Sequence, residues 1–178
     1  MPSDEGVRIS VARISLADLN TAARDRFVAL LDGVYEHSPW VAERAWAARH
    51  FVDVDTLHTA LEATVAAAHH DEQLALLCAH PDLGARARMS DASTGEQAGA
   101  GLDRLPPDLY ARLLRLNTSY RERFGFPFLL AVAGRTAPAI VEALEQRLPR
   151  TPEEEFAEAL RQVARIARIR LDAIVDAA

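Results

Sequence analysis

The C-terminal part of the chain reads TPEEEFAEALRQVARIARIRLDAI from Thr151 to Ile174. Thr151 is a suitable N-cap, Pro152 suits the first helical position, and Glu154 completes a capping box. Apolar residues then recur at helical spacing and form one stripe, made of Phe156, Leu160, Val163, Ala167, Leu171 and Ile174. The stretch predicts a long amphipathic helix whose apolar face packs on a helical core.

Arginines on this helix fall into two groups. Arg161, Arg165 and Arg168 lie opposite the apolar stripe and are expected to be solvated. Arg170 lies within the stripe, where a guanidinium needs an anion or must extend its head to solvent. Two interpretations of Arg170 stay open: a structural one, as a buried ion pair or a snorkelling stem, and a substrate-binding one, because its bidentate fork fits a carboxylate.

Alanine- and leucine-rich segments with regular start and stop signals predict helices elsewhere in the chain. The expected helices are Ser15 to Val34, Val41 to Arg49, Thr56 to about His69 with Asp55 as cap, Asp71 to Ala79, Ser93 to about Asp103, Pro107 to Phe124, and Thr136 to Leu148. We therefore expect an all-α, single-domain bundle of about eight to nine helices over residues 1–178, with 1–13 as a flexible N-terminal segment.

Composition excludes several classes of protein. The 178 residues are 49% hydrophobic and 26% charged, which is typical of a globular domain. The net charge is −6, and the 20 basic residues, all arginine, alternate with acids, so a nucleic-acid partner is not expected. The lack of lysine excludes Schiff-base chemistry on a lysine side chain. The single cysteine, Cys78, excludes an internal disulfide and is expected to be buried.

No stretch is apolar enough for long enough to span a bilayer, and no membrane partner is expected. Residues 1–13 lack the order of a secretory signal, which favours a cytoplasmic protein. His69 to Glu72 contains metal-ligand residue types, but neighbours on a helix point about 100° apart, so we interpret this segment as a solvated helix junction and expect no metal.

His80 lies at a predicted helix C-terminus, directly before Pro81. A helix C-terminus favours the imidazolium, so we expect a raised pKa, which suits a proton donor. The alternative is a histidine that caps the free carbonyls of the helix.

Ser93 and Glu96 have the spacing of a capping box, which would explain both residues structurally. The functional alternative uses the same helix start: its free N–H groups bind an anion, and Glu96 with Gln97 orients a polar ligand and moves a proton. The phenylalanine-rich stretch over 124–128 is interpreted either as core packing or as the wall of a pocket.

Taken together and in order, several segments resemble the 2-oxo-4-hydroxy-4-carboxy-5-ureidoimidazoline (OHCU) decarboxylase family of urate degradation. The matching residues are His37 to Val41, His80 to Gly84, Ser93 with Glu96 and Gln97, Gly101 and Leu102, Asn117 with Tyr120, Arg123 to Phe128, and Arg165 to Leu171. The resemblance spans roughly residues 15–175. It implies an all-helical enzyme that needs no cofactor, forms a homodimer and produces (S)-allantoin.

The resemblance also implies site residues. His80 and Glu96 match the catalytic pair, and the substrate contacts are matched by Pro81, Ser93, Gln97, Phe128, Leu129, Leu130, Ala131, Val132 and Arg170. The expected function is a cofactor-independent carboxy-lyase acting on a small ureidoimidazoline, with His80 as general acid–base. Two alternatives stay open: a non-catalytic helical module that binds a ureide or docks a partner, and a hydrolase of a related ureide.

Overall fold

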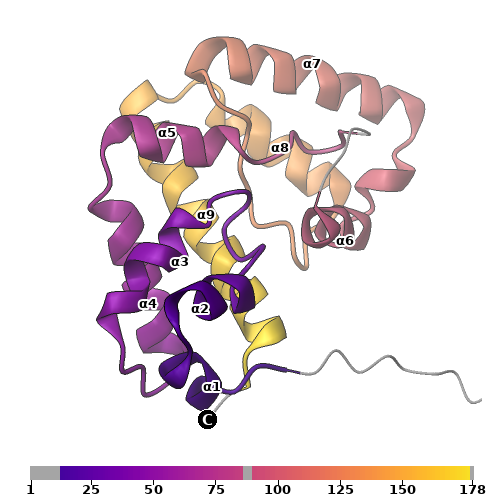
Figure 1. Cartoon of the computed structure of the whole chain (residues 1–178). Coiled ribbons are helices and arrows are strands. Elements are labelled where there is room, and N and C mark those ends of the chain that lie inside the picture. Colours follow the sequence, from indigo (N-terminus) through magenta and orange to yellow (C-terminus); the bar gives the residue numbers. More distant parts are fainter. Residues whose placement is uncertain (1–12, 86–89, 177–178) are drawn as a thin grey trace, which may run out of the picture.

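The computed structural model describes residues 13–85 and 90–176. In these ranges the chain forms helices α1 Leu16–Thr21, α2 Arg24–Leu30, α3 Trp40–Ala45, η1 Trp46–Ala48, α4 Val54–Ala66, α5 His70–Cys78, α6 Asp91–Gly99, η2 Leu102–Arg104, α7 Pro107–Phe124, α8 Ala137–Arg147 and α9 Pro152–Ile174 (Figure 1). One isolated bridge, between Ile14 and Val175, is the only β-pairing within those ranges. The predicted all-α class is confirmed. The expected flexible segment lies, apart from Arg13, outside the described residues.

Helix α9 runs through the middle of the molecule and packs against α4, α5 and α7 (Figure 1). Its predicted start is correct: the Thr151 hydroxyl accepts from the Glu154 N–H at 3.3 Å, and the Glu154 carboxylate accepts from the Thr151 N–H at 3.1 Å. Arg161 and Arg165 are exposed, as expected. The C-terminal end of α9 lies beside Ile14 at the start of the described chain, and Arg170, one turn earlier, contacts α6.

The predicted single helix from Ser15 to Val34 is wrong, because the chain breaks between α1 and α2. Ala22 adopts an extended conformation there. The Ala22 carbonyl, which a continuous helix would use internally, instead accepts from the side chains of Trp46 at 3.2 Å and Arg49 at 2.6 Å. Side chains from a later segment thus satisfy the carbonyl and allow the bend.

The start of α4 also differs from expectation. Asp53, rather than Asp55, is the N-cap: its carboxylate accepts from the Thr56 N–H at 2.7 Å, and the Thr56 hydroxyl accepts from the Asp53 N–H at 3.2 Å. Both aspartates can cap, but the helix begins two residues earlier than expected, so that Val54 joins Leu57 and Leu61 among the buried residues of α4. Asp55 is exposed and pairs with Arg168.

Cys78 is exposed at the end of α5, so the expectation of a buried residue is wrong. At the other end of α5, His69 is the N-cap, and the Glu72 carboxylate accepts its N–H at 3.1 Å while pairing with Arg44. These contacts agree with a helix junction. Across the ranges 13–85 and 90–176, no helix is both long and apolar enough to cross a membrane.

The phenylalanine-rich stretch packs in the core, as the structural interpretation predicts. Gly125 ends α7 in the left-handed region, at φ 80°, and the Tyr120 ring lies 4.6 Å from that of Phe124 and 5.2 Å from that of Phe128. The segment that follows, which its apolar sequence allows to be either a helix or an extended segment ending near Gly134, forms no helix up to Val132.

A buried polar group lies beside these rings, and we call Tyr120, Arg147 and Glu155 the core cluster. Glu155 is fully buried. Its carboxylate accepts from the Tyr120 hydroxyl and, at 2.6 Å, from Arg147 Nε. Arg147 Nη1 donates to the Leu129 carbonyl at 2.7 Å. The core cluster therefore ties α7, α8 and α9 to the non-helical segment after Phe128.

Candidate active site

His80 follows α5 and is 5% exposed. Its ring Nδ1 lies 3.0 Å from the Leu76 carbonyl oxygen. Because a carbonyl only accepts, Nδ1 carries a proton, and in the neutral ring the basic lone pair is on Nε2. The helix C-terminus therefore fixes the tautomer of the imidazole through one hydrogen bond.

The expected rise in the pKa of His80 is wrong. Burial is the largest effect and lowers the pKa below its ordinary value of 6.5. The bond to Leu76 and the carboxylates of Glu36 and Glu96 act in the opposite direction, while Arg170 lowers the pKa further. Removal from water outweighs the favourable helix end, so His80 is neutral near pH 7 and is suited to accept a proton.

Helix α6 begins earlier than predicted. Its N-cap is Ser90, whose hydroxyl accepts from the Ser93 N–H at 3.2 Å, so Ser93 lies inside the helix and the capping-box interpretation of Ser93 and Glu96 is wrong. Ser93, Glu96 and Gln97 instead share one helical face, at i, i+3 and i+4. This face is directed into the molecule, which frees the side chains for contacts with other elements.

Arg170 enters this region from α9 and is 6% exposed. Nε and Nη2 donate to the two oxygens of Glu96 at 2.7 and 3.0 Å. Nη1 donates to the Gly33 carbonyl at 2.8 Å and to Glu36 Oε2 at 2.9 Å, and Nη2 also donates to the Ser93 hydroxyl at 3.1 Å. All five N–H groups are therefore used, and Arg170 forms the buried ion pair of the structural interpretation.

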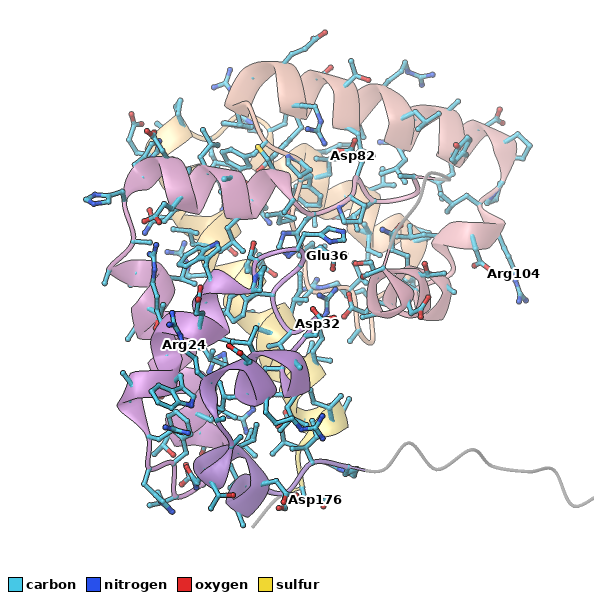
Figure 2. The ribbon with its side chains drawn as sticks, viewed as in Figure 1. Arg24, Asp32, Glu36, Asp82, Arg104 and Asp176 are labelled. Atoms are coloured by element: carbon cyan, nitrogen blue, oxygen red, sulfur yellow. The ribbon has the colours of Figure 1, made fainter. Side chains whose placement is uncertain are left out.

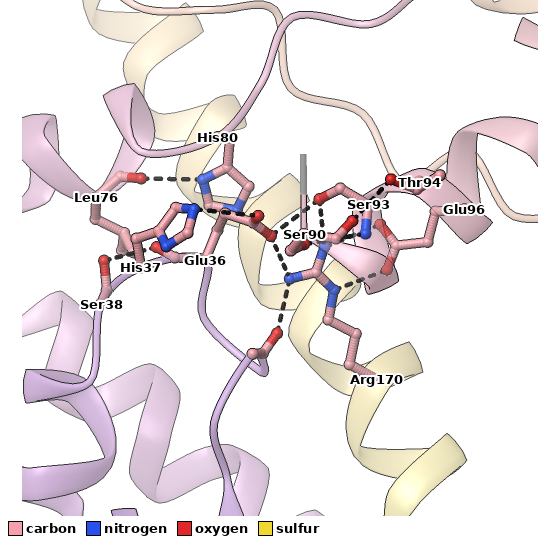
Figure 3. A network of polar contacts seen from close by, with 11 residues as sticks. Glu36, His37, Ser38, Leu76, His80, Ser90, Ser93, Thr94, Glu96 and Arg170 are labelled. Carbon is pink, nitrogen blue, oxygen red and sulfur yellow. Dashed lines mark hydrogen bonds and ion pairs between the residues drawn. The ribbon is translucent and has the colours of Figure 1, made fainter. Parts of the chain in front are cut away.

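Glu36 is a site residue that the sequence analysis missed. It lies in the turn between α2 and α3 and is 1% exposed, and Figure 2 shows it near the middle of the molecule, whereas Arg24 and Arg104 lie at the surface. Its Oε2 accepts from the Ser93 hydroxyl at 2.9 Å as well as from Arg170. We call Glu36, Ser93, Glu96 and Arg170 the cavity cluster (Figure 3).

The ionisation of Glu36 follows from these contacts. Burial by itself raises the pKa of a carboxyl, but hydrogen bonds from Ser90, Arg170 and Ser93 outweigh burial, so the pKa of Glu36 lies below its ordinary value. Glu36 is therefore a carboxylate at neutral pH. In the cavity cluster one guanidinium, that of Arg170, therefore pairs with the carboxyl groups of both Glu36 and Glu96.

A narrow cavity of about 30 Å³ joins His80 to the cavity cluster. Its lining consists of His80, Pro81, Leu83, Ser93, Glu96, Gln97, Phe128, Leu129, Leu130, Val132, Ile166 and Arg170. All the predicted site residues except Ala131 are among them. The Ala131 N–H donates to the Gln162 side chain at 3.0 Å instead.

Two polar side chains shape the loop that forms one wall of the cavity. The Gln97 side chain accepts from the Gly84 N–H at 2.7 Å, and Asn117 donates to the Leu83 carbonyl at 2.8 Å. Gly84 has a φ of 74°, and a β-carbon there would lie 2.7 Å from a methyl carbon of Leu113. A glycine is thus required where the loop passes over α7.

Comparison with known proteins identifies the family. The sequence profile of the family described as OHCU decarboxylase matches residues 20–172. The 2-oxo-4-hydroxy-4-carboxy-5-ureidoimidazoline decarboxylase of Halalkalicoccus jeotgali is 46% identical over 91% of this chain and 92% of its own, and that of Haloferax volcanii is 48% identical over 89% and 94%. The chain belongs to the OHCU decarboxylase family.

A crystal structure of (S)-allantoin synthase superposes on this decarboxylase-family chain with a TM-score of 0.74 and 34% identity, over 92% of this chain and 55% of that one. A crystal structure of OHCU decarboxylase in the presence of (S)-allantoin gives a TM-score of 0.66 at 20% identity, which shows a shared fold. The family assignment therefore rests on sequence and on fold together.

The sequence indicates that Arg170 has an acidic partner but does not identify it as Glu36. An arginine on the apolar stripe of α9 requires an anion nearby, and Arg170 was singled out for this reason. The chain has 26 acidic residues, however, and nothing in their spacing to Arg170 selects one that lies 134 positions earlier. The decarboxylase-family fold makes this pairing.

Proposed function

We propose that this chain catalyses the cofactor-independent decarboxylation of OHCU to (S)-allantoin in urate degradation. The observation that carries the proposal is the convergence of His80, Glu96 and Arg170 on one buried cavity in a member of this family. The remaining site roles follow from the contacts around that cavity.

The substrate supplies its own electron sink. One ring carbon bears the carboxylate and a hydroxyl, and the neighbouring ring carbon is part of a C=N bond. When the bond to the carboxylate breaks, CO₂ leaves and the electron pair forms a C=C bond as the C=N nitrogen takes a proton. The hydroxyl then loses its proton to become a carbonyl, and a proton is added to the neighbouring carbon.

His80 is assigned to the proton transfers. Its neutral ring, held by the Nδ1–H bond to Leu76, presents Nε2 as the base that takes the hydroxyl proton. The resulting imidazolium is the acid that delivers a proton to one face of the neighbouring carbon. Delivery to one face gives a single enantiomer. Pro81, Gln97 and the backbone from Phe128 to Val132 are assigned to holding the ring, with Ala131 acting only through its place in that segment.

Glu96 and Arg170 are assigned a linked role. Arg170 has no N–H left for a ligand in this arrangement, so a ligand oxygen reaches it only by displacing an acceptor. The Glu96 side chain is 23% exposed, whereas that of Glu36 is 1% exposed, so Glu96 is the carboxylate to be displaced. The freed carboxylate then binds the substrate hydroxyl or a ring N–H, and the guanidinium binds the ligand oxygen.

The decisive experiment adds the protein to freshly generated urate oxidation products and follows optically active allantoin by circular dichroism. We expect rapid formation of the (S) enantiomer, and a loss of about 10²–10⁴-fold in kcat for H80N. H50N, which changes an exposed histidine outside the cavity, is the matched control and should keep the wild-type rate.

Other outcomes would contradict the proposal. Binding of a ureide without turnover would identify a binding module, and opened-chain products would identify a hydrolase. Allantoin that forms only at the uncatalysed rate would exclude the decarboxylase activity, and a wild-type rate in H80N would exclude the role of His80.

We further propose a homodimer, which sedimentation of the purified protein tests, and a cytoplasmic location, which fractionation of the source cells tests.

A further inference from the structure

Glu36 is not part of the cavity wall, although it contacts two residues that are. Its Oε2 lies 2.9 Å from Arg170 Nη1 and 2.9 Å from the Ser93 hydroxyl oxygen. Arg170 comes from α9 and Ser93 from α6, so one carboxylate in the α2–α3 turn joins three parts of the chain (Figure 3). A residue placed in this way contacts the cavity wall only through these partners.

The two carboxylates on Arg170 differ in exposure and in what they hold. Glu36 is 1% exposed and is bonded to Nη1, together with the Gly33 carbonyl. Glu96 is partly exposed and takes the opposite edge, formed by Nε and Nη2. One edge of the guanidinium is therefore enclosed by protein, and the other faces the cavity.

We propose that Glu36 is a positioning residue of the decarboxylation site, which fixes Arg170 and Ser93 so that the Nε–Nη2 edge of the guanidinium stays directed at the cavity when Glu96 gives way to a ligand oxygen. This inference rests on the function proposed above. Glu36 touches no reacting atom and acts through the two side chains it holds.

The physical reason is the cost of an unpaired buried charge. If Glu96 leaves Arg170 and no second carboxylate is present, the buried guanidinium has no countercharge until the ligand binds. A long arginine side chain without an anchor also gains rotamers and loses the direction of its fork. Glu36 removes both problems, because its carboxylate stays in place whichever group occupies the other edge.

Two variants of Glu36 test the length of its side chain and its charge separately. E36D keeps the charge but shortens the side chain by one methylene, so it should no longer hold both partners, and we expect kcat to fall about 10- to 100-fold with KM changed less, as a misplaced catalytic group implies. E36Q keeps the reach and one acceptor oxygen, so its kcat should lie between those of E36D and the wild type.

E155D is the matched control, since it shortens a carboxylate of equal burial in the core cluster. It should lower the melting temperature while the kcat of the folded protein stays within about threefold of wild type, because Glu155 contacts neither His80 nor the cavity cluster. Wild-type kcat in folded E36D, or an equal loss in E155D, would overturn the proposal.

A second readout does not depend on turnover. The Nε–H group of Arg170 gives a nitrogen-15 NMR signal, which is assigned by its absence in R170K. The rate at which this proton exchanges with water reports how firmly the side chain is held. E36D should speed this exchange at least about tenfold, because the guanidinium loses its anchor at Nη1 and its Nε–H bond to Glu96 then opens more often. E155D should leave the exchange unchanged. If E36D is unfolded, the same comparison is made with E36Q. An unchanged exchange rate in the folded variant overturns the inference. This readout holds even if OHCU proves not to be the substrate.

Discussion

The cavity cluster and the core cluster are both buried, and both contain an arginine bonded to a carboxylate, yet they differ in what surrounds them. In the core cluster one carboxylate, Glu155, has two arginine partners, Arg147 and, at 3.7 Å, Arg150. The Tyr120 hydroxyl and the Leu129 carbonyl add further contacts. In the cavity cluster one arginine holds two carboxylates, and one of these, Glu96, reaches solvent and lines a cavity. A buried ion pair alone therefore does not distinguish the candidate site from the core. The distinguishing feature is a second, partly exposed carboxylate, that of Glu96, beside the cavity.

The strongest test of this comparison removes each arginine in turn. In R147M the carboxylate of Glu155 loses its main partner, and we expect the free energy of unfolding to fall by about 3–5 kcal/mol in a urea titration, while the folded fraction still turns over substrate. R170M should be destabilised as well and should also lose at least about 100-fold in kcat, because Glu96 is no longer oriented. An equal loss of turnover in both variants would remove the distinction between the clusters.

A smaller effect is expected on the pH dependence of turnover. The charged groups that face His80 are Arg170, Glu36 and Glu96. In the proposed mechanism His80 acts first as a base, so kcat/KM should rise with pH as the imidazolium loses its proton, with a midpoint below the ordinary value of 6.5. E36Q removes a negative charge that favours the imidazolium, so the midpoint of this rise in kcat/KM, the acid limb of the profile, should move to lower pH.

E155Q serves as the control for that profile, since Glu155 belongs to the core cluster. Its acid limb should coincide with that of the wild type. A rise of kcat/KM with falling pH, or an equal displacement of the limb in both variants, would contradict the assignment of His80 as a base influenced by Glu36.

The smallest expected effect concerns stability at the two ends of the pH range. The pKa of His80 is lowered in the folded protein, so the unfolded chain binds the proton first and stability falls as the pH drops below 6.5. The lowered pKa of Glu36 acts in the same direction below 4.5. The pKa of Tyr120 is raised, chiefly by burial, so stability falls as the pH rises above 10.0.

Melting temperatures of two variants across the pH range check these directions. H80N should flatten the acid side of the profile. Y120F should flatten part of the alkaline side, where Tyr35, whose pKa burial also raises, contributes the rest. If each variant changed the opposite side, the directions of the pKa shifts assigned to His80 and Tyr120 would be wrong.

Local signals in the sequence predicted most helices well. The capping box and proline at Thr151 and Pro152 define the start of α9, and Gly125 ends α7, because these signals act within a few residues. The sequence also singled out Arg170, since a charge on an apolar stripe conflicts with its surroundings. Errors arose where several residues could serve equally as caps, as with Ser90 and Ser93 before α6.

Other features depended on contacts between distant segments. The bend at Ala22 is stabilised by side chains more than 20 positions later, and the lowered pKa of His80 reflects burial by elements that its own helix does not contain. Local sequence predicts a favourable helix end for this imidazole, but the loss of water depends on the whole fold and is the larger effect.

The amino-acid sequence by itself determined the helical class, the long amphipathic helix and the residue types able to decarboxylate a substrate that carries its own electron sink. The tertiary structure alone decided which carboxylates meet Arg170, which nitrogen of His80 is free, and that Glu36 belongs to the site. The reason is physical: helix formation and capping depend on near neighbours, whereas burial, ion pairing and cavity shape depend on elements brought together only when the whole chain folds.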